Sequence, residues 1–219
     1  MASDHACTRC GSAFTNAMPL DELGRCAVCR RGLWGFDAAY SFGYYETELR
    51  RLLHIFKYEK VHTLARPLAK RMQAALPRQD RYDVIVPVPM HWRKRMARGF
   101  NQAELLSAEL AKSLAIPVST KALRRTKSAP AQASMSFAQR RAGMRAGAFA
   151  VRRPNAVAGR RVLLIDDVFT TGATARACAR ELKRAGAAHV TLLTLARVDR
   201  RPIVRIGRAR ATAATTGEM

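Results

Sequence analysis

The stretch from Leu163 to Ala175, LLIDDVFTTGATA, constrains the fold more than any other part of the chain. An apolar run ends in two adjacent carboxylates, Asp166 and Asp167, and a short loop of hydroxyl and small side chains leads into a helical pattern. This order predicts a buried strand, a tight loop and a helix N-terminus. Backbone N–H groups in such a loop converge on an anion, and the helix dipole favours negative charge there. The two carboxylates suit ribose hydroxyls or a hydrated Mg²⁺, so a sugar phosphate is the first ligand to consider.

Strand-like and helix-like patterns alternate along the rest of the chain. Leu49, Leu53 and Phe56, for example, recur at the spacing of one face of a helix. This alternation predicts an α/β fold with a mostly parallel sheet flanked by helices. Ligands in such sheets bind at the carboxyl ends of strands, which is where the two aspartates lie. The predicted strands cover residues 38–45, 82–88, 120–125, 149–152, 162–168 and 189–198, the predicted helices cover 49–56, 64–76, 101–115 and 173–185, and residues 91–100 and 128–139 are predicted loops.

Four of the five cysteines form two pairs with the spacing C-x2-C-x15-C-x2-C: Cys7, Cys10, Cys26 and Cys29. Each pair presents two thiolates to one ion, so the four together predict a tetrahedral structural Zn²⁺ site. A redox CxxC motif and a site that has lost its metal are the alternatives. With four cysteine ligands no coordination position stays open, so catalysis at the metal is not expected.

These signals divide the chain into three parts. Residues 1–36 form a small zinc ribbon, which is too short to build its own core and would depend on the metal for folding free energy. Residues 37–199 form the α/β domain. Residues 200–219 form a basic, Ala/Thr-rich tail without periodicity, which we expect to be flexible.

The charge of the chain is strongly positive, with 39 Lys and Arg against 16 Asp and Glu and a formal net charge of +23. No Asp or Glu occurs between Leu110 and Ile165. Such a block predicts a basic rim around a phosphate site or a groove for a nucleic-acid backbone, although an arginine-rich solvated surface would look the same. No apolar window is long enough to span a membrane and the N-terminus has no secretory pattern, so a cytoplasmic protein is expected.

The sequence LLIDDVFTTGAT resembles the phosphoribosyl-pyrophosphate (PRPP) binding motif of type I phosphoribosyltransferases. The resemblance implies that Asp166 and Asp167 bind the ribose 2′- and 3′-hydroxyls and that Mg²⁺ accompanies PRPP. It also implies that the loop holds the 5′-phosphate through Thr170, Thr171, Gly172, Ala173 and Thr174.

The four-cysteine ribbon, the VPVP strand end, the RGFNQ stretch and this motif together resemble the ComF family, over about residues 7–198. By position, the loop from Pro87 resembles the pyrophosphate loop of phosphoribosyltransferases and residues 124–141 resemble their flexible loop. An Asn that is usual in the family is absent from the segment 142–145. The resemblance makes these residues candidates for the pyrophosphate and flexible-loop contacts: Arg95, Arg98, Asn101, Gln102, Arg125 and Lys127.

Three functions follow from these features. The first is a PRPP-binding, phosphoribosyltransferase-like protein associated with DNA uptake or DNA utilisation, whose turnover stays open because no acceptor or dedicated general base is evident. The second is a protein that binds single-stranded DNA through the basic centre and the ribbon. The third is an adaptor that contacts helicase-like competence proteins.

Overall fold

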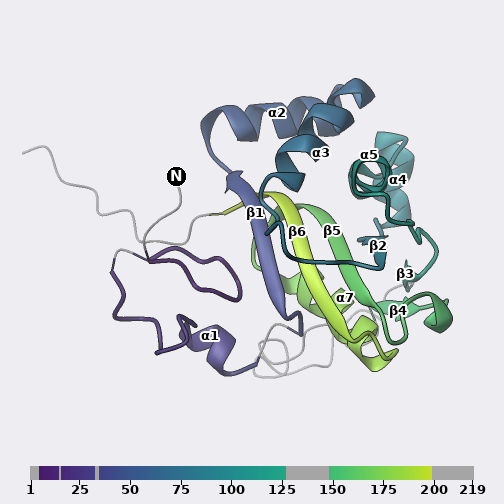
Figure 1. Ribbon diagram of the computed structural model, residues 1–219. Helices are drawn as coiled ribbons and strands as arrows, with labels where there is room; N and C mark the ends of the chain where they lie inside the picture. The colour runs from purple at the N-terminus through teal and green to yellow at the C-terminus, as the bar shows by residue number, and fades with distance from the viewer. Residues whose placement is uncertain (1–4, 15, 33–34, 127–147, 199–219) are drawn as a thin grey trace, which may run out of the picture.

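The computed structural model describes residues 5–14, 16–32, 35–126 and 148–198. Its centre is a four-stranded parallel sheet in the order β1-β6-β5-β2 (Figure 1). The strands are β1 (Ala38–Tyr44), β2 (Val84–Pro87), β5 (Arg161–Phe169) and β6 (His189–Arg197). The predicted α/β class and the parallel sheet are therefore confirmed.

Helices cover both faces of the sheet (Figure 1). One face carries α2 (Thr47–Tyr58), the 3-10 turn η1 (His62–Leu64), α3 (Ala65–Gln73) and α5 (Gln102–Leu114), and the other carries α7 (Ala173–Arg184). Side chains alternate along a strand, so β5 contributes to the hydrophobic layers on both faces of the sheet, the first under α2, α3 and α5 and the second under α7. Leu163 and Ile165 pack in the first layer, whereas Val162 and Leu164 pack in the layer of α7.

A second, smaller sheet pairs β3 (Leu123–Arg125) with β4 (Phe149–Val151) in antiparallel register. A 3-10 turn, η2 (Pro154–Ala156), follows β4 and leads into β5. Both strands were predicted, and β4 packs against α7.

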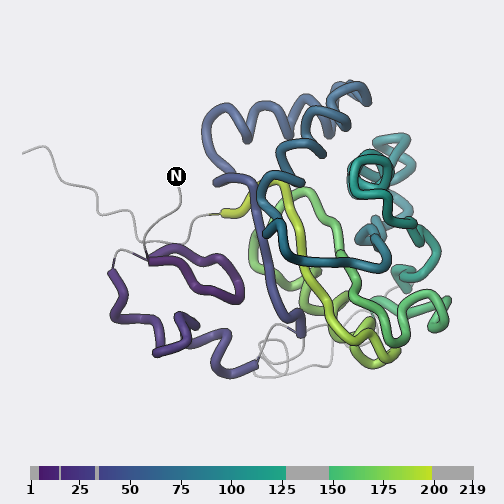
Figure 2. Tube along the Cα trace, viewed as in Figure 1, coloured from purple at the N-terminus to yellow at the C-terminus, as the bar shows by residue number. Residues whose placement is uncertain are grey.

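The N-terminal segment lies beside β1, as the trace in Figure 2 shows. It has two isolated bridges, Ala6 with Ala13 and Leu20 with Cys26, and one short helix, α1 (Ala27–Arg30). The backbone N–H of Ala39 in β1 donates to the carbonyl of Arg9 at 2.7 Å. The segment thus docks on the sheet through main-chain contacts as well as side chains.

One predicted loop is wrong. Residues 92–98 of the basic stretch form α4 (Trp92–Arg98). The Nδ1 atom of His91 accepts from the backbone N–H of Arg93, and Gly99, with a φ of 82°, ends the helix. Long unbranched side chains lose little freedom in a helix, and the left-handed Gly supplies the stop, which together explain why this basic run is helical.

Some predictions fall outside the described residues. These are the loop over 128–139, the candidate Lys127, the segment 142–145 and the tail over 200–219. Within the described ranges, no helix combines the length and the apolar character needed to cross a bilayer.

Candidate functional site

The loop between β5 and α7 turns at Gly172. Its φ of 71° lies in the left-handed region, where a residue without Cβ is favoured. Gly172 is also the N-cap of α7, so no side chain of the N-cap residue occupies the helix end; the Oγ1 atom of exposed Thr171 accepts from the N–H of Ala173 at 3.3 Å. The first turn of a helix has N–H groups without partners inside the helix, and these attract an anion. A small cavity of about 30 Å³ lies here, lined by Asp166, Phe169, Gly172 and Thr174 among others.

Asp166 and Asp167 stand at the carboxyl end of β5 and face opposite layers. Asp166 lines the cavity on the side of α7, and its Oδ1 accepts from the N–H of Asp167 at 2.9 Å. Burial, followed by the negative charge of Asp167, raises the pKa of Asp166 to about 7. A carboxyl group in this state is ready to ionise when a hydroxyl donor or a cation arrives.

Asp167 is held by an ion pair with Lys57, a residue in the last turn of α2. The Nζ atom of Lys57 lies 2.7 Å from Oδ2 of Asp167, and both side chains are largely buried, at 14% and 16% exposure. The positive charge of Lys57 also acts on Asp166, where it lowers the pKa against the two raising effects. The sequence analysis missed Lys57, because a lysine in the last turn of an amphipathic helix carries no signal of its distant partner.

The RGFNQ stretch makes contacts inside the protein. Asn101 is 3% exposed; its side-chain oxygen accepts from the N–H of Ala103, and its amide nitrogen donates to the carbonyl of Val88 at 3.1 Å. Gln102 is buried in the first turn of α5. Asn101 therefore joins the loop after β2 to the start of α5, whereas the side-chain oxygen of Gln102 accepts from Arg98 of α4 at 3.3 Å.

The candidate arginines are also engaged. Arg98 donates to the hydroxyl of Tyr58 at 3.1 Å and lies over its ring, with 4.9 Å from Cζ to the centroid. Arg95 pairs with Glu104 at 2.8 Å. Arg125 on β3 lies over the ring of Phe149. Arg98 thus contacts α2, Arg95 contacts α5 and Arg125 contacts β4, and their part in binding pyrophosphate stays a prediction.

The four cysteines of the two CxxC pairs meet in one buried cluster. Their sulfur atoms all lie within 4.8 Å of one another. The Sγ atoms of Cys7 and Cys29 are 3.6 Å apart, and those of Cys10 and Cys26 are 3.8 Å apart. A tetrahedron with Zn–S bonds of about 2.3 Å has edges of about 3.8 Å, so the cluster has the size that a single ion needs.

The chemistry of the cluster also favours a cation. The pKa of Cys29 rises far above its ordinary value because of its hydrogen bonds with Cys10 and Cys7 and because of its burial. Four buried thiols at this distance cannot all ionise without a positive ion among them. The residues present thus fit a metal ion held by four thiolates.

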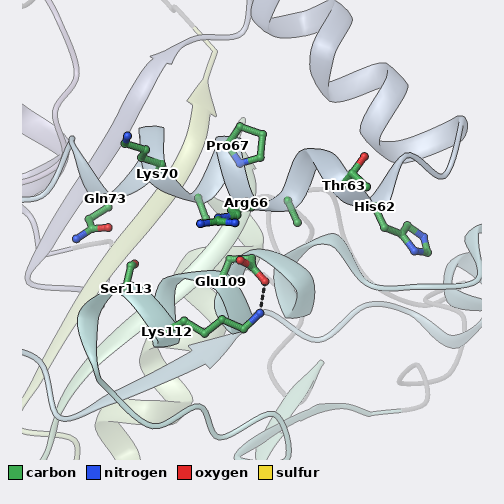
Figure 3. Close-up of a pocket in the computed structure, with 11 residues that line it drawn as sticks. His62, Thr63, Arg66, Pro67, Lys70, Gln73, Glu109, Lys112 and Ser113 are labelled. Atoms are coloured by element: carbon green, nitrogen blue, oxygen red, sulfur yellow. Dashed lines mark hydrogen bonds and ion pairs between the residues drawn. The ribbon is translucent and has the colours of Figure 1, made fainter.

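A separate groove lies between α3 and α5 (Figure 3). Its volume is about 1230 Å³. Figure 3 shows Arg66 and Lys70 from α3 and Lys112 from α5 along its walls. Buried Ala65 and Ala69 also line the groove, and so does Glu109 of α5, which forms an ion pair with Lys112.

Comparison with known proteins places this geometry in a family. Residues 81–207 match the model described as Phosphoribosyl transferase domain. The chain belongs to this family. The matched range contains β2, β5, the loop at Gly172, α7 and β6, and so includes the two aspartates and the loop that follows them, whereas Lys57 of α2 lies outside it.

Named relatives extend the match over most of the chain. Competence protein F of Haemophilus influenzae is 29% identical over 197 residues, which cover 87% of this chain and 84% of that protein. DNA utilization protein YhgH of Escherichia coli K12 is 30% identical over 201 residues, covering 87% and 83%. These relatives confirm the resemblance to the ComF family. Among solved structures, adenine phosphoribosyltransferase from Thermoanaerobacter pseudethanolicus is 18% identical, with 64% of this chain and 83% of that chain covered and a TM-score of 0.41.

Proposed function

We propose that this protein binds PRPP, or a closely related ribose 5-phosphate, together with Mg²⁺ at the carboxyl end of β5. The observation that carries the proposal is the order of groups at this point: two carboxylates, then a left-handed glycine, then the N-terminus of a twelve-residue helix. The amides of the loop and of the first turn of α7 suit the 5′-phosphate. The carboxylates suit the ribose hydroxyls.

The two carboxylates have different tasks in this proposal. Asp167 is already paired with Lys57, so its charge is balanced before a ligand arrives. Asp166, with a pKa near 7, changes its charge when the ligand binds. Ribose hydroxyls that donate hydrogen bonds to the carboxylate would favour the ionised form of Asp166.

Calorimetry tests the proposal. Wild-type protein is titrated with PRPP and Mg²⁺, and separately with ribose 5-phosphate and with pyrophosphate. Asp166→Asn/Asp167→Asn is the test variant, and Glu181→Gln, which removes a partly buried carboxylate paired with Arg184 near the other end of α7, is the matched control. We expect binding to wild type and control and none to the double variant at the same concentrations. Equal binding to all three would contradict the ribose assignment.

Turnover is a further question, because the acceptor that would displace pyrophosphate from C1 of the ribose is not identified. A screen for pyrophosphate release, with PRPP as donor and bases, amines and nucleic acids as acceptors, addresses it. Release with one acceptor class would make the protein a phosphoribosyltransferase in the catalytic sense. PRPP binding without release would favour a sensor or a binding protein on the same fold.

Binding of single-stranded DNA is the second candidate function, and the groove between α3 and α5 is the observation that favours it. Arg66, Lys70 and Lys112 lie along an open groove in a chain with a net charge of +23. The names of the relatives refer to competence and to DNA utilisation. Contacts with helicase-like competence proteins are a further expectation that rests on the family resemblance. A cytoplasmic location is an expectation from the sequence pattern.

The salt dependence of binding tests the groove. Each phosphate contact to a single strand contributes a slope of roughly −0.7 to the plot of log K against log salt. Replacing Arg66, Lys70 and Lys112 by Ala should therefore reduce the slope by about 2 in fluorescence anisotropy with an oligothymidine. Replacing three exposed arginines elsewhere, Arg152, Arg153 and Arg160, is the charge-matched control. If both triple variants lose the same amount, the charge is diffuse and the groove is not the site.

The identity of the metal in the cysteine cluster is proposed to be Zn²⁺, since four thiolates at tetrahedral spacing suit it. Elemental analysis of the purified protein should give about one zinc ion per chain. Cys26→Ser should lower this content. A folded wild-type protein without metal would contradict the proposal.

A further inference from the structure

Arg197, the last residue of β6, lies between the cysteine cluster and the loop that follows β5. Its side chain is nearly buried, at 9% exposure. Its Nη1 atom donates to the carbonyl of Cys10 at 2.7 Å, and its Nη2 atom donates to the Oγ atom of Ser12 at 2.9 Å. These hydrogen bonds tie the end of β6 to the cysteine segment, because a buried charge that loses its partners costs free energy.

The turn at Gly11, which follows the first CxxC pair, packs tightly against the guanidinium of Arg197. Gly11 has a φ of 65°, and a Cβ atom there would lie 2.8 Å from Nη1 of Arg197 and 3.3 Å from the carbonyl oxygen of Ala39. The thiol of Cys10 also donates to the Oγ atom of Ser12 at 3.2 Å. The turn after the first CxxC pair is therefore shaped around the guanidinium. A divalent ion with four thiolates carries net negative charge, which a neighbouring guanidinium offsets.

The other side of Arg197 contacts Phe169, the last residue of β5. The two residues are register partners in the parallel pair of β5 and β6, and Cζ of Arg197 lies 5.5 Å from the ring centroid. Phe36 packs edge-on against the same ring, with centroids 6.2 Å apart. The carbonyl of Phe36 in turn accepts two hydrogen bonds from Arg9, at 3.1 and 2.8 Å. Arg9 lies within the first CxxC pair. The ring of Phe169 is therefore contacted by Arg197 and by Phe36, and each of these two residues is hydrogen-bonded to the cysteine segment.

Phe169 belongs to the candidate phosphate loop. It is 5% exposed and lines the small cavity with Thr170 and Gly172. A shift of its ring would change the position at which the loop leaves β5. Packed side chains transmit such shifts because protein interiors have little free volume.

We propose that Arg197 is a positioning residue that couples metal occupancy of the cysteine cluster to the conformation of the phosphate loop. With metal bound, the turn at Gly11 and Ser12 fixes the guanidinium, which together with Phe36 holds Phe169 in place. Without metal, the turn relaxes, the guanidinium loses both acceptors and the loop loses its support. Coupling of this kind is reciprocal, so a ligand at the loop slows metal loss. This last step rests on the proposed function, whereas the step from metal to loop does not.

Hydrogen exchange measured by mass spectrometry tests the step from metal to loop in the full-length chain. Zn²⁺-loaded protein is compared with protein stripped by a chelator and with stripped protein to which Zn²⁺ is returned. We expect the peptide covering residues 169–175 to exchange roughly tenfold faster after stripping and to recover with Zn²⁺. Peptides from α5 should not change. Unchanged exchange at 169–175 in stripped wild type would overturn the proposal.

Substitutions identify Arg197 as the link. Arg197→Met removes the charge and the donors, Arg197→Lys keeps the charge without the planar fork, and Gly11→Ala displaces the guanidinium by the added methyl group. Outer-shell changes of this kind cost about 10- to 100-fold in metal affinity, so Arg197→Met and Gly11→Ala should lose metal to a chelator at least tenfold faster. Their effects should not add in the double variant, because both act on one contact. Arg160→Met, at the opposite end of the sheet, is the control.

The outcomes separate the two proposals. Wild-type metal release and wild-type loop exchange in both Arg197→Lys and Gly11→Ala would overturn the role of Arg197 even if Arg197→Met does not fold. If hydrogen exchange at residues 169–175 depends on bound metal but the protein does not bind PRPP, the coupling is supported and the proposed function is refuted. PRPP that binds wild type and slows its metal release, but does not slow release from Gly11→Ala, supports both.

Discussion

The helices α5 and α7 both begin near the carboxyl ends of parallel strands, but their N-termini are finished in opposite ways. Asn101 caps α5 with its own side chain, and the same side chain binds the carbonyl of Val88 at the end of β2. Gly172 opens α7 without a side chain and with left-handed backbone. The first end is closed by the protein itself, and the second end leaves room for a ligand.

The two helix N-termini also differ in the charged side chains of their first turns. The first turn of α5 contains Glu104, which is paired with Arg95, so the positive end of its dipole already has an anion. The first turn of α7 contains no acidic residue, and the carboxylates next to it belong to β5. Within the described structure, the N-terminus of α5 is therefore satisfied by internal contacts, whereas the N-terminus of α7 is the proposed anion site. Substitutions at α5 should change stability, and substitutions beside α7 should change ligand binding.

The largest effect is expected from Asp166→Asn/Asp167→Asn. Hydrogen bonds to charged groups contribute about 1.5–3 kcal/mol each, so loss of both should weaken binding of PRPP with Mg²⁺ by at least about 100-fold. The single variant Asp166→Asn should not lower the unfolding temperature, since Asp166 is a carboxyl group with a raised pKa beside a second carboxylate. Asp167→Asn, in contrast, also leaves Lys57 without its ion-pair partner, so stability is compared in the single variant. Calorimetry and thermal unfolding measure the two quantities. A loss of binding in Asp166→Asn that comes with a large loss of stability would remove the contrast with α5.

Asn101→Ala should show the reverse pattern. It removes the cap of α5 and leaves the carbonyl of Val88 without this donor. A lost N-cap costs about 1 kcal/mol and an unsatisfied buried group about 1–3 kcal/mol, so the free energy of unfolding should fall by about 2–4 kcal/mol. The affinity for PRPP should stay within twofold. Denaturant unfolding and calorimetry check both, and Asn101→Asp, which keeps the cap acceptor, should recover part of the stability.

Much of this contrast was accessible from the sequence, and part of it was not. The cysteine cluster and the β5–loop–α7 unit were predicted because their signals are local: a fixed spacing, and an apolar run followed by acids and a glycine. The helix α4 was predicted as a loop because none of its residues is buried, so its sequence lacks the periodic apolar face that marks a helix. The partners Lys57 and Asp167, and likewise Arg197 and Cys10, lie far apart in the chain, so only the three-dimensional structure brings them together.

The pH dependence of the α7 site follows from Asp166. The folded-state pKa of about 7 lies above the ordinary value of 3.8, so the folded protein binds more protons than the unfolded chain between these values. The free energy of unfolding of the ligand-free protein should therefore fall as the pH rises from about 4 to about 7, and Asp166→Asn should remove this trend. If the ligand needs the ionised carboxylate, its affinity should rise about tenfold from pH 6 to pH 8. Carboxyl-carbon NMR of Asp166 gives the midpoint directly, and a midpoint near 4 would contradict the assignment.

The smallest effect is expected from Lys57→Met, which separates the two acids of the α7 site. Lys57 lowers the pKa of Asp166 against the effects of burial and of Asp167, so its removal should move the midpoint of Asp166 upward. Because Asp166 would then be less ionised at pH 7, the affinity for PRPP should fall by a few-fold there and recover at higher pH. Lys57→Arg keeps the charge and should leave the midpoint close to that of wild type. A loss of affinity that is equal at all pH values would instead mean that Lys57 contacts the ligand itself, and that α2 supplies a binding group as well as a counter-charge to the site beside α7.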